Sequence, residues 1–399
     1  MLRRLPAALI LAALPCIVCA QATDAARQLA ADATIVDTHI DAPGVLLDHW
    51  ADLGVAAPDR EFDYPRARAG GLDVAFMSIY TSPRQDDDGS AWQVANEMID
   101  GVEALVQRHP DRFALLTSPA QVAAAGARVL LPLGMENGAP LGDKLENVQF
   151  FFDRGVRYIT LAHSANNRLA DSSYAQEKKW NGLSPLGRQV VREMNRLGIM
   201  VDVSHLGDAS AREAITLSTV PVIASHSAFR HFTPGFERNI SDDIAKAVAA
   251  GGGVVQVPFG TAFIDPDSAA DTQAHFRAIR AFDLRNAELK AQGQPVQDRA
   301  AFDQQWEAAH PARASTLAQV LEQIDYGVKL IGVDHIGIGS DFDGVDGELP
   351  PQLKTVADYP NLVAGLQARG YADADIRKIL GGNLLRVWAR VEAGAQPAR

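Results

Sequence analysis

The chain has 399 residues, of which 47% are hydrophobic and 22% are charged, and this ordinary globular balance supports a large buried core. Its formal net charge is -12 at pH 7, which argues against nucleic acid or an anionic membrane as a partner, because both need basic patches. The length allows two domains or one large barrel.

The amino-terminal segment differs in composition from the rest of the chain. Two arginines precede an apolar run over residues 5–17, and the small residue Ala20 follows it. This pattern predicts a secretory signal peptide over residues 1–20, and the alternative is an uncleaved membrane anchor. Both cysteines lie in this segment, so the mature protein would rely on its core or on metal instead of disulfides. We expect an exported protein, periplasmic or secreted, without a membrane anchor after cleavage.

Apolar runs and helical patterns alternate along the remaining chain. Thr34, Ile35 and Val36 are β-formers that open the first of eight expected strands, which are residues 33–41, 72–80, 129–133, 156–161, 199–203, 220–224, 253–257 and 336–341. Helical spacing lies between several of these runs, at residues 92–107, 185–197, 209–217 and 317–330 and in a helix that opens at residue 242. The clearest helix has Ser184 as its cap and ends at Gly198.

Buried strands separated mainly by helices favour an α/β fold, a single (β/α)8 barrel of the TIM type, over a doubly wound sheet. We expect this barrel to form one catalytic domain over residues 21–399. Residues 261–312 are polar, charged and helix-prone. They predict a helical insertion over the barrel mouth, between the seventh and eighth strands.

Six of the expected strands end in residues that can bind metal or transfer protons. His39 and Asp41 alternate along the first run and would project from one face. The carboxyl ends of the strands of such a barrel open onto one rim. We therefore expect the strand-end residues to meet there, and they are His39, Asp41, Glu136, His163, His205, His226 and Asp341.

The strand-end set contains enough ligands for two metal ions. Three imidazoles and two carboxylates suit two zinc ions that share a carboxylate and a hydroxide, and these ligands are His39, Asp41, Glu136, His205 and His226. A single tetrahedral site needs only three protein ligands and water, so it would leave two of them unused. Glu136 is flanked by glycines and is the expected bridge. Asp341 is then free to act as general acid and base, with Asp343 as a rival for that role.

Each of these residues also has a structural interpretation that the sequence leaves open. His39 and Asp41 could form a hydrogen-bonded strand end, and Glu136 or Asp341 could be a turn residue. His163 could be a buried core histidine. The other six histidines lie away from the strand ends and have no expected role; they are His49, His109, His231, His275, His310 and His335.

Six short motifs contain the strand-end residues. They are Asp37-Thr38-His39-Ile40-Asp41, Gly134-Met135-Glu136-Asn137-Gly138, Leu161-Ala162-His163-Ser164, Asp202-Val203-Ser204-His205, Ser225-His226-Ser227 and the run from Gly337 to Gly344. Two further motifs are Arg238-Asn239 and the run from Asn383 to Val387. Together they resemble the motifs of the renal or membrane dipeptidase family, binuclear zinc peptidases among the amidohydrolase-like barrels. The resemblance covers almost all of the mature chain. It implies that His39 and Asp41 bind the first zinc ion, that His205 and His226 bind the second, and that Glu136 bridges them.

The resemblance also implies how a substrate is held. His163 would contact the substrate near the scissile carbonyl, and Arg238 would receive the terminal carboxylate through its planar guanidinium. The implied reaction is hydrolysis of dipeptides with a free carboxyl end, D-residues at that position included, and the implied assembly is a homodimer. The run Val257-Pro258-Phe259-Gly260 lacks the Asn that many members have before the Phe, so the substrate preference stays open.

Two other functions are compatible with the same residues. Another binuclear-metal amidohydrolase would act on N-acyl amino acids, lactams or phosphoesters. A non-catalytic periplasmic binding protein would use the barrel only to hold a ligand. Asp341 argues against this last function, because binding alone needs no proton shuttle.

Overall fold

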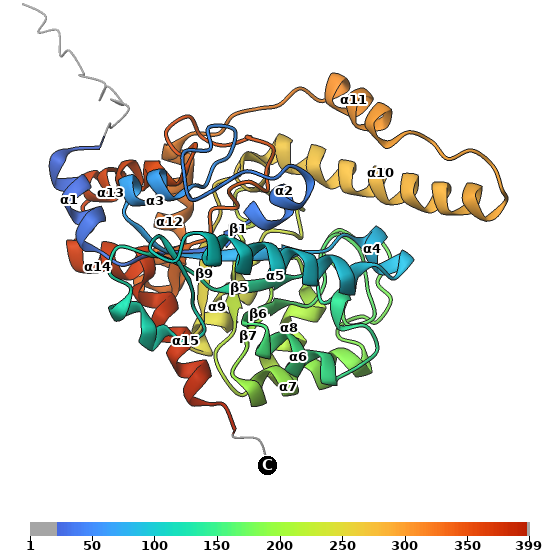
Figure 1. The fold of residues 1–399 in the computed structure, drawn as a ribbon, viewed down its shortest axis with the longest axis horizontal. Helices are drawn as coiled ribbons and strands as arrows, with labels where there is room; N and C mark the ends of the chain where they lie inside the picture. The colour runs from blue at the N-terminus through green and yellow to red at the C-terminus, as the bar shows by residue number, and fades with distance from the viewer. Residues whose placement is uncertain (1–21, 397–399) are drawn as a thin grey trace, which may run out of the picture.

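The computed structural model describes residues 22–396, and the signal peptide expected over residues 1–20 lies outside them. Eight of the ten strands of one parallel sheet form a ring with helices around it (Figure 1). In ring order they are β1 (Ile35–Ile40), β2 (Leu72–Tyr80), β5 (Leu133–Glu136), β6 (Val156–Thr160), β7 (Met200–Asp202), β8 (Ile223–Ala224), β9 (Val254–Val257) and β10 (Ile336–Ile338). The predicted (β/α)8 barrel is confirmed.

The ring closes between β1 and the chain that follows β10. The N–H of Asp341 donates to the carbonyl of His39 at 3.1 Å. Asp37 adds a side-chain link, because its Oδ1 accepts from the N–H of His39 at 3.0 Å and from the N–H of Ser340 at 2.9 Å. The first and last strands are thereby joined at the end of the barrel that carries His39 and Asp341.

The third expected strand is divided in the structure. Pro132, which has no N–H to donate to a ladder, separates β5 from β4 (Val129–Leu131). Both pieces pair with β2, but β4 also pairs with a short additional strand, β3 (Phe113–Leu115), whereas β5 pairs with β6. β5 continues to Glu136, beyond the expected end of the strand at residue 133.

Two further strands are shorter than predicted. The expected strand over residues 220–224 includes Pro221 and contributes only Ile223 and Ala224 to the sheet, because a proline cannot donate to the ladder. The expected strand over residues 336–341 ends at Ile338. Asp341 has a φ of 68°, and this left-handed backbone conformation is incompatible with a continuing strand.

The predicted helices are present with their ends shifted by at most one residue, as α5 (Ala91–Arg108), α7 (Pro185–Leu197), α8 (Asp208–Leu217), α9 (Asp242–Ala250) and α12 (Leu317–Ile331). In α7 the Ser184 side chain accepts from the N–H of Gly187, and Gly198 ends the helix with a φ of 82°. Helices that the sequence did not predict individually are α1 (Asp24–Asp32), α2 (Ala42–Asp48), α3 (Tyr64–Gly70), α4 (Pro83–Asp88), α6 (Glu146–Asp153), α13 (Tyr359–Ala368), α14 (Asp373–Arg377) and α15 (Asn383–Ala393).

The carboxyl-terminal helix α15 closes the end of the barrel at which the strands begin. Trp388 is fully buried there, with its ring centroid 5.3 Å from that of Phe76. Side chains from the early part of the strands join the same apolar cluster, among them Val36, Val74, Met200 and Val254. The barrel core therefore lies below the strand-end residues, which occupy the opposite end.

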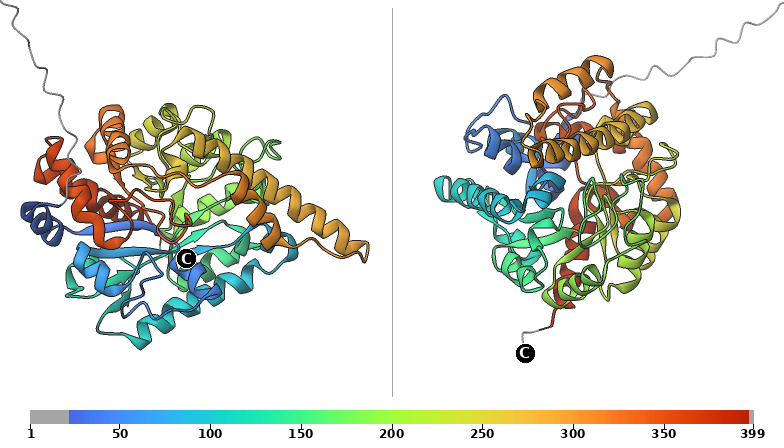
Figure 2. Two further views of the ribbon diagram at one scale, coloured as in Figure 1. Left: turned by 90° about the horizontal axis from the view of Figure 1, so that it is seen from above. Right: turned by 90° about the vertical axis from the view of Figure 1, so that its right-hand side faces the viewer.

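A helical arm lies between β9 and α12. It consists of α10 (Pro266–Ala291) and α11 (Arg299–Ala309), and the far end of α10 extends well beyond the barrel (Figures 1 and 2). Phe276, in the first half of α10, lines the cavity at the barrel mouth. The segment expected as an insertion, residues 261–312, thus has its base at the mouth, while its outer part projects away from it. Within residues 22–396, no helix has the length and apolar composition needed to cross a membrane.

Candidate metal centre

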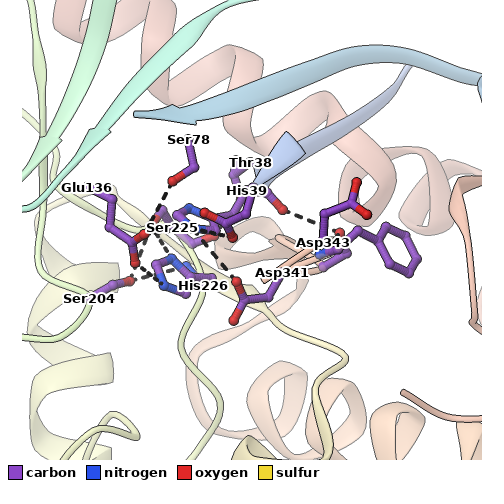
Figure 3. A network of polar contacts seen from close by, with 12 residues as sticks. Thr38, His39, Ser78, Glu136, Ser204, Ser225, His226, Asp341 and Asp343 are labelled. Atoms are coloured by element: carbon purple, nitrogen blue, oxygen red, sulfur yellow. Dashed lines mark hydrogen bonds and ion pairs between the residues drawn. The ribbon is translucent and has the colours of Figure 1, made fainter. Parts of the chain in front are cut away.

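The strand-end residues meet at the carboxyl end of the barrel. Figure 3 shows four of them, His39, Glu136, His226 and Asp341. Three overlapping groups of side chains place their ligand atoms close enough to hold a metal ion. The groups are His39, Glu136 and His226; Glu136, His163 and His205; and His39, Asp41 and Asp341. Every strand-end residue predicted from the sequence therefore lies in one cluster, although the residues come from six separate strands and loops.

The carboxylate of Glu136 lies at the centre of the cluster. Its Oε1 is 3.0 Å from Nε2 of His205 and 3.2 Å from Nε2 of His226, and 3.5 Å from Nε2 of His163. Its Oε2 is instead 3.4 Å from Nε2 of His39 and accepts a hydrogen bond from the Ser78 hydroxyl at 3.2 Å. The two oxygens of one carboxylate thus face different histidines.

The other carboxylates gather around His39. Nε2 of His39 is 3.4 Å from Oδ2 of Asp41 and 3.8 Å from Oδ1 of Asp341. This nitrogen is fully buried and has no hydrogen-bond partner in the described part of the chain, residues 22–396. Burial opposes a charge on His39, but Tyr158 and the carboxylates of Glu136 and Asp41 raise its pKa well above the usual value. The interactions at this point favour a positive charge.

Hydrogen bonds behind two of the histidines set the tautomer of each ring. The Tyr158 hydroxyl donates to the carbonyl of Thr38 at 3.1 Å, so it accepts from Nδ1 of His39 at 2.8 Å. The Ser225 hydroxyl donates to Asp202 at 2.7 Å, so it accepts from Nδ1 of His226 at 2.7 Å. In both rings these bonds place a proton on Nδ1, so Nε2 is the nitrogen that can bind a metal ion at the centre.

His205 reaches the centre from a strained position. Its backbone φ is 64°, in the left-handed region that a non-glycine residue seldom adopts. An N–H of Arg238 lies 2.9 Å from Nε2 of His205, so this nitrogen also presents a lone pair. Burial, with the charge of Arg238 adding to it, holds the pKa of His205 well below its usual value. Imidazole nitrogens grouped with buried carboxylates are the donor set that a borderline metal ion prefers, so these residues fit a metal centre.

Burial and neighbouring charges shift the pKa values of Glu136, Asp341 and His163 in different directions. Burial opposes ionisation of Glu136, but His39 and His163 hold its pKa well below the usual value. Burial raises the pKa of Asp341 well above its usual value, and the Asp41 carboxylate adds to the effect. Burial lowers the pKa of His163 to about 4. At neutral pH Glu136 is therefore ionised and His163 is neutral, whereas Asp341 keeps its proton to a higher pH than an ordinary carboxyl group does.

Asp341 and Asp343 are the two candidates for the acid-base role, and their surroundings distinguish them. Asp343 turns away from the histidines, since its Oδ1 accepts from the N–H of Glu61 at 2.8 Å, whereas Asp341 faces His39. Gly344 passes so close to the cluster that a Cβ there would collide with the Asp41 carboxylate and lie 2.7 Å from Oδ1 of Asp341. The loop after β10 thus brings Asp341, and not Asp343, to the centre.

Arg238 lies beside the cluster but is almost fully buried, at 2% exposure. Its Nη1 donates to the Ser227 hydroxyl and its Nη2 to the carbonyl of His226, both at 2.9 Å. Among the residues that the structure describes, its Nε has no hydrogen-bond partner, and the guanidinium lies 4.8 Å above the ring of Phe263. The structure therefore brings the guanidinium of Arg238 to the centre.

A cavity of about 550 Å³ opens above the cluster. Its walls include Tyr80, Tyr174 and Phe276, none of which the sequence singled out, because aromatic residues at such spacing are typical of any core. His275 also lines it, although it had no expected role, because the arm carries it to the mouth. Tyr158 and Ser225 were likewise missed as supports of the histidines, and only the recurrent Ser-His pairs of the sequence could have indicated the second.

Comparison with known proteins adds a family and a set of relatives. A profile of the family described as membrane dipeptidase (peptidase family M19) matches residues 23–399. An uncharacterized dipeptidase of Schizosaccharomyces pombe is 30% identical over 376 residues, which cover 90% of this chain and 81% of that protein. Dipeptidase aclJ of Aspergillus oryzae is 29% identical over 341 residues, covering 83% and 70%. The crystal structure of the probable dipeptidase PvdM from Pseudomonas aeruginosa, 27% identical, matches with a TM-score of 0.79 over 93% of this chain and 98% of that one.

Proposed function

Since this chain belongs to the membrane dipeptidase family and is a metallo-dipeptidase, we propose that it binds two zinc ions and uses them to hydrolyse dipeptides with a free carboxyl end. The observation that carries the proposal is the position of Glu136, whose two oxygens face different histidines 3.0 and 3.4 Å away. A carboxylate shared by two ions needs this arrangement. A single ion would leave one side of Glu136 without a counter-charge.

The ligands divide into two groups around that bridge. We assign His39 and Asp41, on the Oε2 side of Glu136, to one ion, and His205 and His226, on the Oε1 side, to the other. Bound zinc would supply Lewis-acid polarisation of the scissile carbonyl and a water of lowered pKa at neutral pH. The tautomers of His39 and His226 support the assignment, because both rings direct a lone pair to the centre.

His163 and Asp341 would carry out the proton and charge steps. His163 is neutral, so it retains one N–H, and it would donate this N–H to the substrate carbonyl oxygen as negative charge develops there. Asp341 would accept the proton of the attacking water and pass it to the leaving amine. Its position 3.8 Å from His39 supports this role, because it faces the centre without being needed as the bridge.

Arg238 would recognise the free carboxyl end of the substrate. A guanidinium binds a carboxylate through paired N–H groups, and Nη2 of Arg238 lies at the centre, 2.9 Å from Nε2 of His205. A dipeptide bound in this way would place its peptide bond over the histidines. Acceptance of a D-residue at the carboxyl end belongs to the same proposal and depends on the cavity walls.

Hydrolysis of a dipeptide panel tests the proposed function. Zinc-loaded protein is assayed with L,L and L,D dipeptides, with the same dipeptides amidated at the carboxyl end, and with N-acyl amino acids and a phosphoester, each with and without a chelator. We expect chelator-sensitive cleavage of the free dipeptides and at least tenfold weaker cleavage of the amides. Absence of dipeptide cleavage by the zinc-loaded protein, or faster cleavage of another substrate class, would overturn the proposal.

Two expectations from the sequence stay predictions. Export rests on the pattern of residues 1–20, which lie outside the described part of the chain, and fractionation of expressing cells would test it. Assembly as a homodimer rests on the family resemblance alone, and light scattering of the purified protein would test it.

A further inference from the structure

One wall of the cavity is aromatic and includes a tyrosine close to the metal centre. Tyr174 lines the cavity and is only 3% exposed. Its ring centroid is 4.5 Å from that of Phe276 and 6.1 Å from that of His205. The ring is therefore held in one place, on the cavity side of His205.

The backbone of Tyr174 is tied to the loops that carry two of the centre's histidines. The Ser172 hydroxyl donates to the carbonyl of His163 and accepts from the N–H of Tyr174 at 3.1 Å. The N–H of Ser173 donates to the carbonyl of His205 at 2.8 Å. Tyr174 thus keeps a fixed position relative to both histidines.

The hydroxyl of Tyr174 has no hydrogen-bond partner within residues 22–396. A buried tyrosine hydroxyl usually finds one, as Tyr158 does at the carbonyl of Thr38 and Tyr359 does at the carboxylate of Asp37. The Tyr174 oxygen is also not sealed by protein atoms, whereas several nearby buried polar atoms are. The hydroxyl is therefore a free donor that faces the cavity.

Tyr174 and Arg238 both lie near His205. Nη2 of Arg238 is 2.9 Å from Nε2 of His205, and the ring of Phe236, two positions before Arg238, lies 6.0 Å from the ring of Tyr174. A neutral O–H donor and a guanidinium thus both lie near His205 at the metal centre.

We propose that the Tyr174 hydroxyl donates a hydrogen bond to the terminal carboxylate of the substrate, beside the guanidinium of Arg238. The inference rests on the proposed function, in which Arg238 takes that carboxylate. The hydroxyl adds a directed hydrogen bond to the charge of Arg238, and a hydrogen bond to a charged group is stronger than one to a neutral amide. Tyr174 is then a substrate-binding residue that selects dipeptides with a free carboxyl end over their amides.

The test compares Tyr174→Phe with the wild-type enzyme on a dipeptide and on the same dipeptide amidated at its carboxyl end. Because the hydroxyl contacts no protein group within residues 22–396, its removal should leave the fold and the zinc content unchanged, and both are measured. We expect KM for the free dipeptide to rise about 10- to 100-fold, with kcat within about twofold of wild type. The kcat/KM for the amide should not change. Tyr64→Phe is the matched control, since the Tyr64 hydroxyl bonds to the carbonyl of Ala127 at the surface.

Each other outcome overturns the inference in a recognisable way. An unchanged KM for the free dipeptide, or an equal loss on the amide, would show that Tyr174 does not contact the carboxylate. A fall in kcat at constant KM would place the hydroxyl at the scissile carbonyl instead. Absence of dipeptide hydrolysis by the wild type would refute the proposed function itself, and this inference with it, before any variant is measured.

Discussion

Tyr158 is the residue on which the orientation of His39 depends most directly. Its hydroxyl accepts the Nδ1–H of His39 at 2.8 Å, inside a fully buried part of the barrel. In Tyr158→Phe this N–H loses its acceptor, and the ring is free to rotate or to adopt the other tautomer. We expect zinc affinity at the His39 side to fall about 10- to 100-fold, measured by competition with a chromophoric chelator. Equal affinities of Tyr158→Phe and the surface control Tyr64→Phe would contradict this role.

The proposed role of Arg238 predicts a change in KM more than in kcat. Arg238→Ala removes the guanidinium beside His205, so substrate binding through the terminal carboxylate should weaken. We expect KM for a dipeptide to rise about tenfold or more, and kcat to fall much less. Steady-state kinetics measure both constants. Arg154→Ala is the control, because Arg154 pairs with Asp100 at the surface. An unchanged KM in Arg238→Ala would show that Arg238 does not bind the terminal carboxylate.

The convergence of the candidate residues was predictable from the sequence, but their supports were not. His39, Asp41 and Glu136 follow recognisable strands, and the carboxyl ends of parallel strands in a barrel share one rim. Tyr158 and Tyr174 carry no such signal, because an aromatic residue in an apolar run is most often part of the core. Their importance depends on distances to residues far away in the sequence, which only the folded chain establishes.

Among the helices, α7 offers the cleanest test of a local stability signal. The Ser184 side chain accepts from the N–H of Gly187 and so satisfies one free donor of the first turn. We expect Ser184→Ala to lower the free energy of unfolding by about 1 kcal/mol, measured by urea denaturation, with activity per folded molecule unchanged. Ser90→Ala is the matched control, since Ser90 precedes α5 without making a cap bond. Equal losses in the two variants would show that the cap bond does not stabilise the protein.

Elements with strong local signals were predicted with accurate ends, whereas short strands were not. α7 has a cap, a proline in its first turn and a terminal glycine, so its limits follow from local chemistry. β3 has three residues, of which only Phe113 is buried. It forms as a strand because it pairs with β4. Apolar composition alone predicted continuous strands over residues 129–133 and 220–224, but Pro132 interrupts the first and Pro221 shortens the second. Pairing across the sheet, which the sequence does not display, decides these limits.

The barrel separates a structural end from a functional end. Trp388 and the other residues of α15 fill the end at which the strands begin, so the core does not depend on the metal centre. The opposite end gathers Asp41, Glu136 and Asp341 around His39, and these carboxylates repel one another without a cation. The apo protein should therefore fold but be less stable than the zinc-loaded protein.

Thermal unfolding with and without zinc measures this difference. A ligand that binds only the folded protein stabilises it by about 2.7 kcal/mol at a concentration of 100 times Kd, so we expect a clear rise in the midpoint on adding zinc to chelator-treated protein. Calcium is the control ion, because it prefers six or more oxygen ligands and should raise the midpoint less. Identical midpoints with and without zinc would contradict stabilisation by the centre.

The central claim is that Glu136 joins two metal ions, one held with His39 and Asp41 and the other with His205 and His226. The zinc content per folded chain, determined by elemental analysis after dialysis, tests it most directly. We predict two equivalents in the wild type and one in His39→Ala, whose circular dichroism should match that of the wild type. One equivalent in the wild type, or two full equivalents in His39→Ala, would contradict the account.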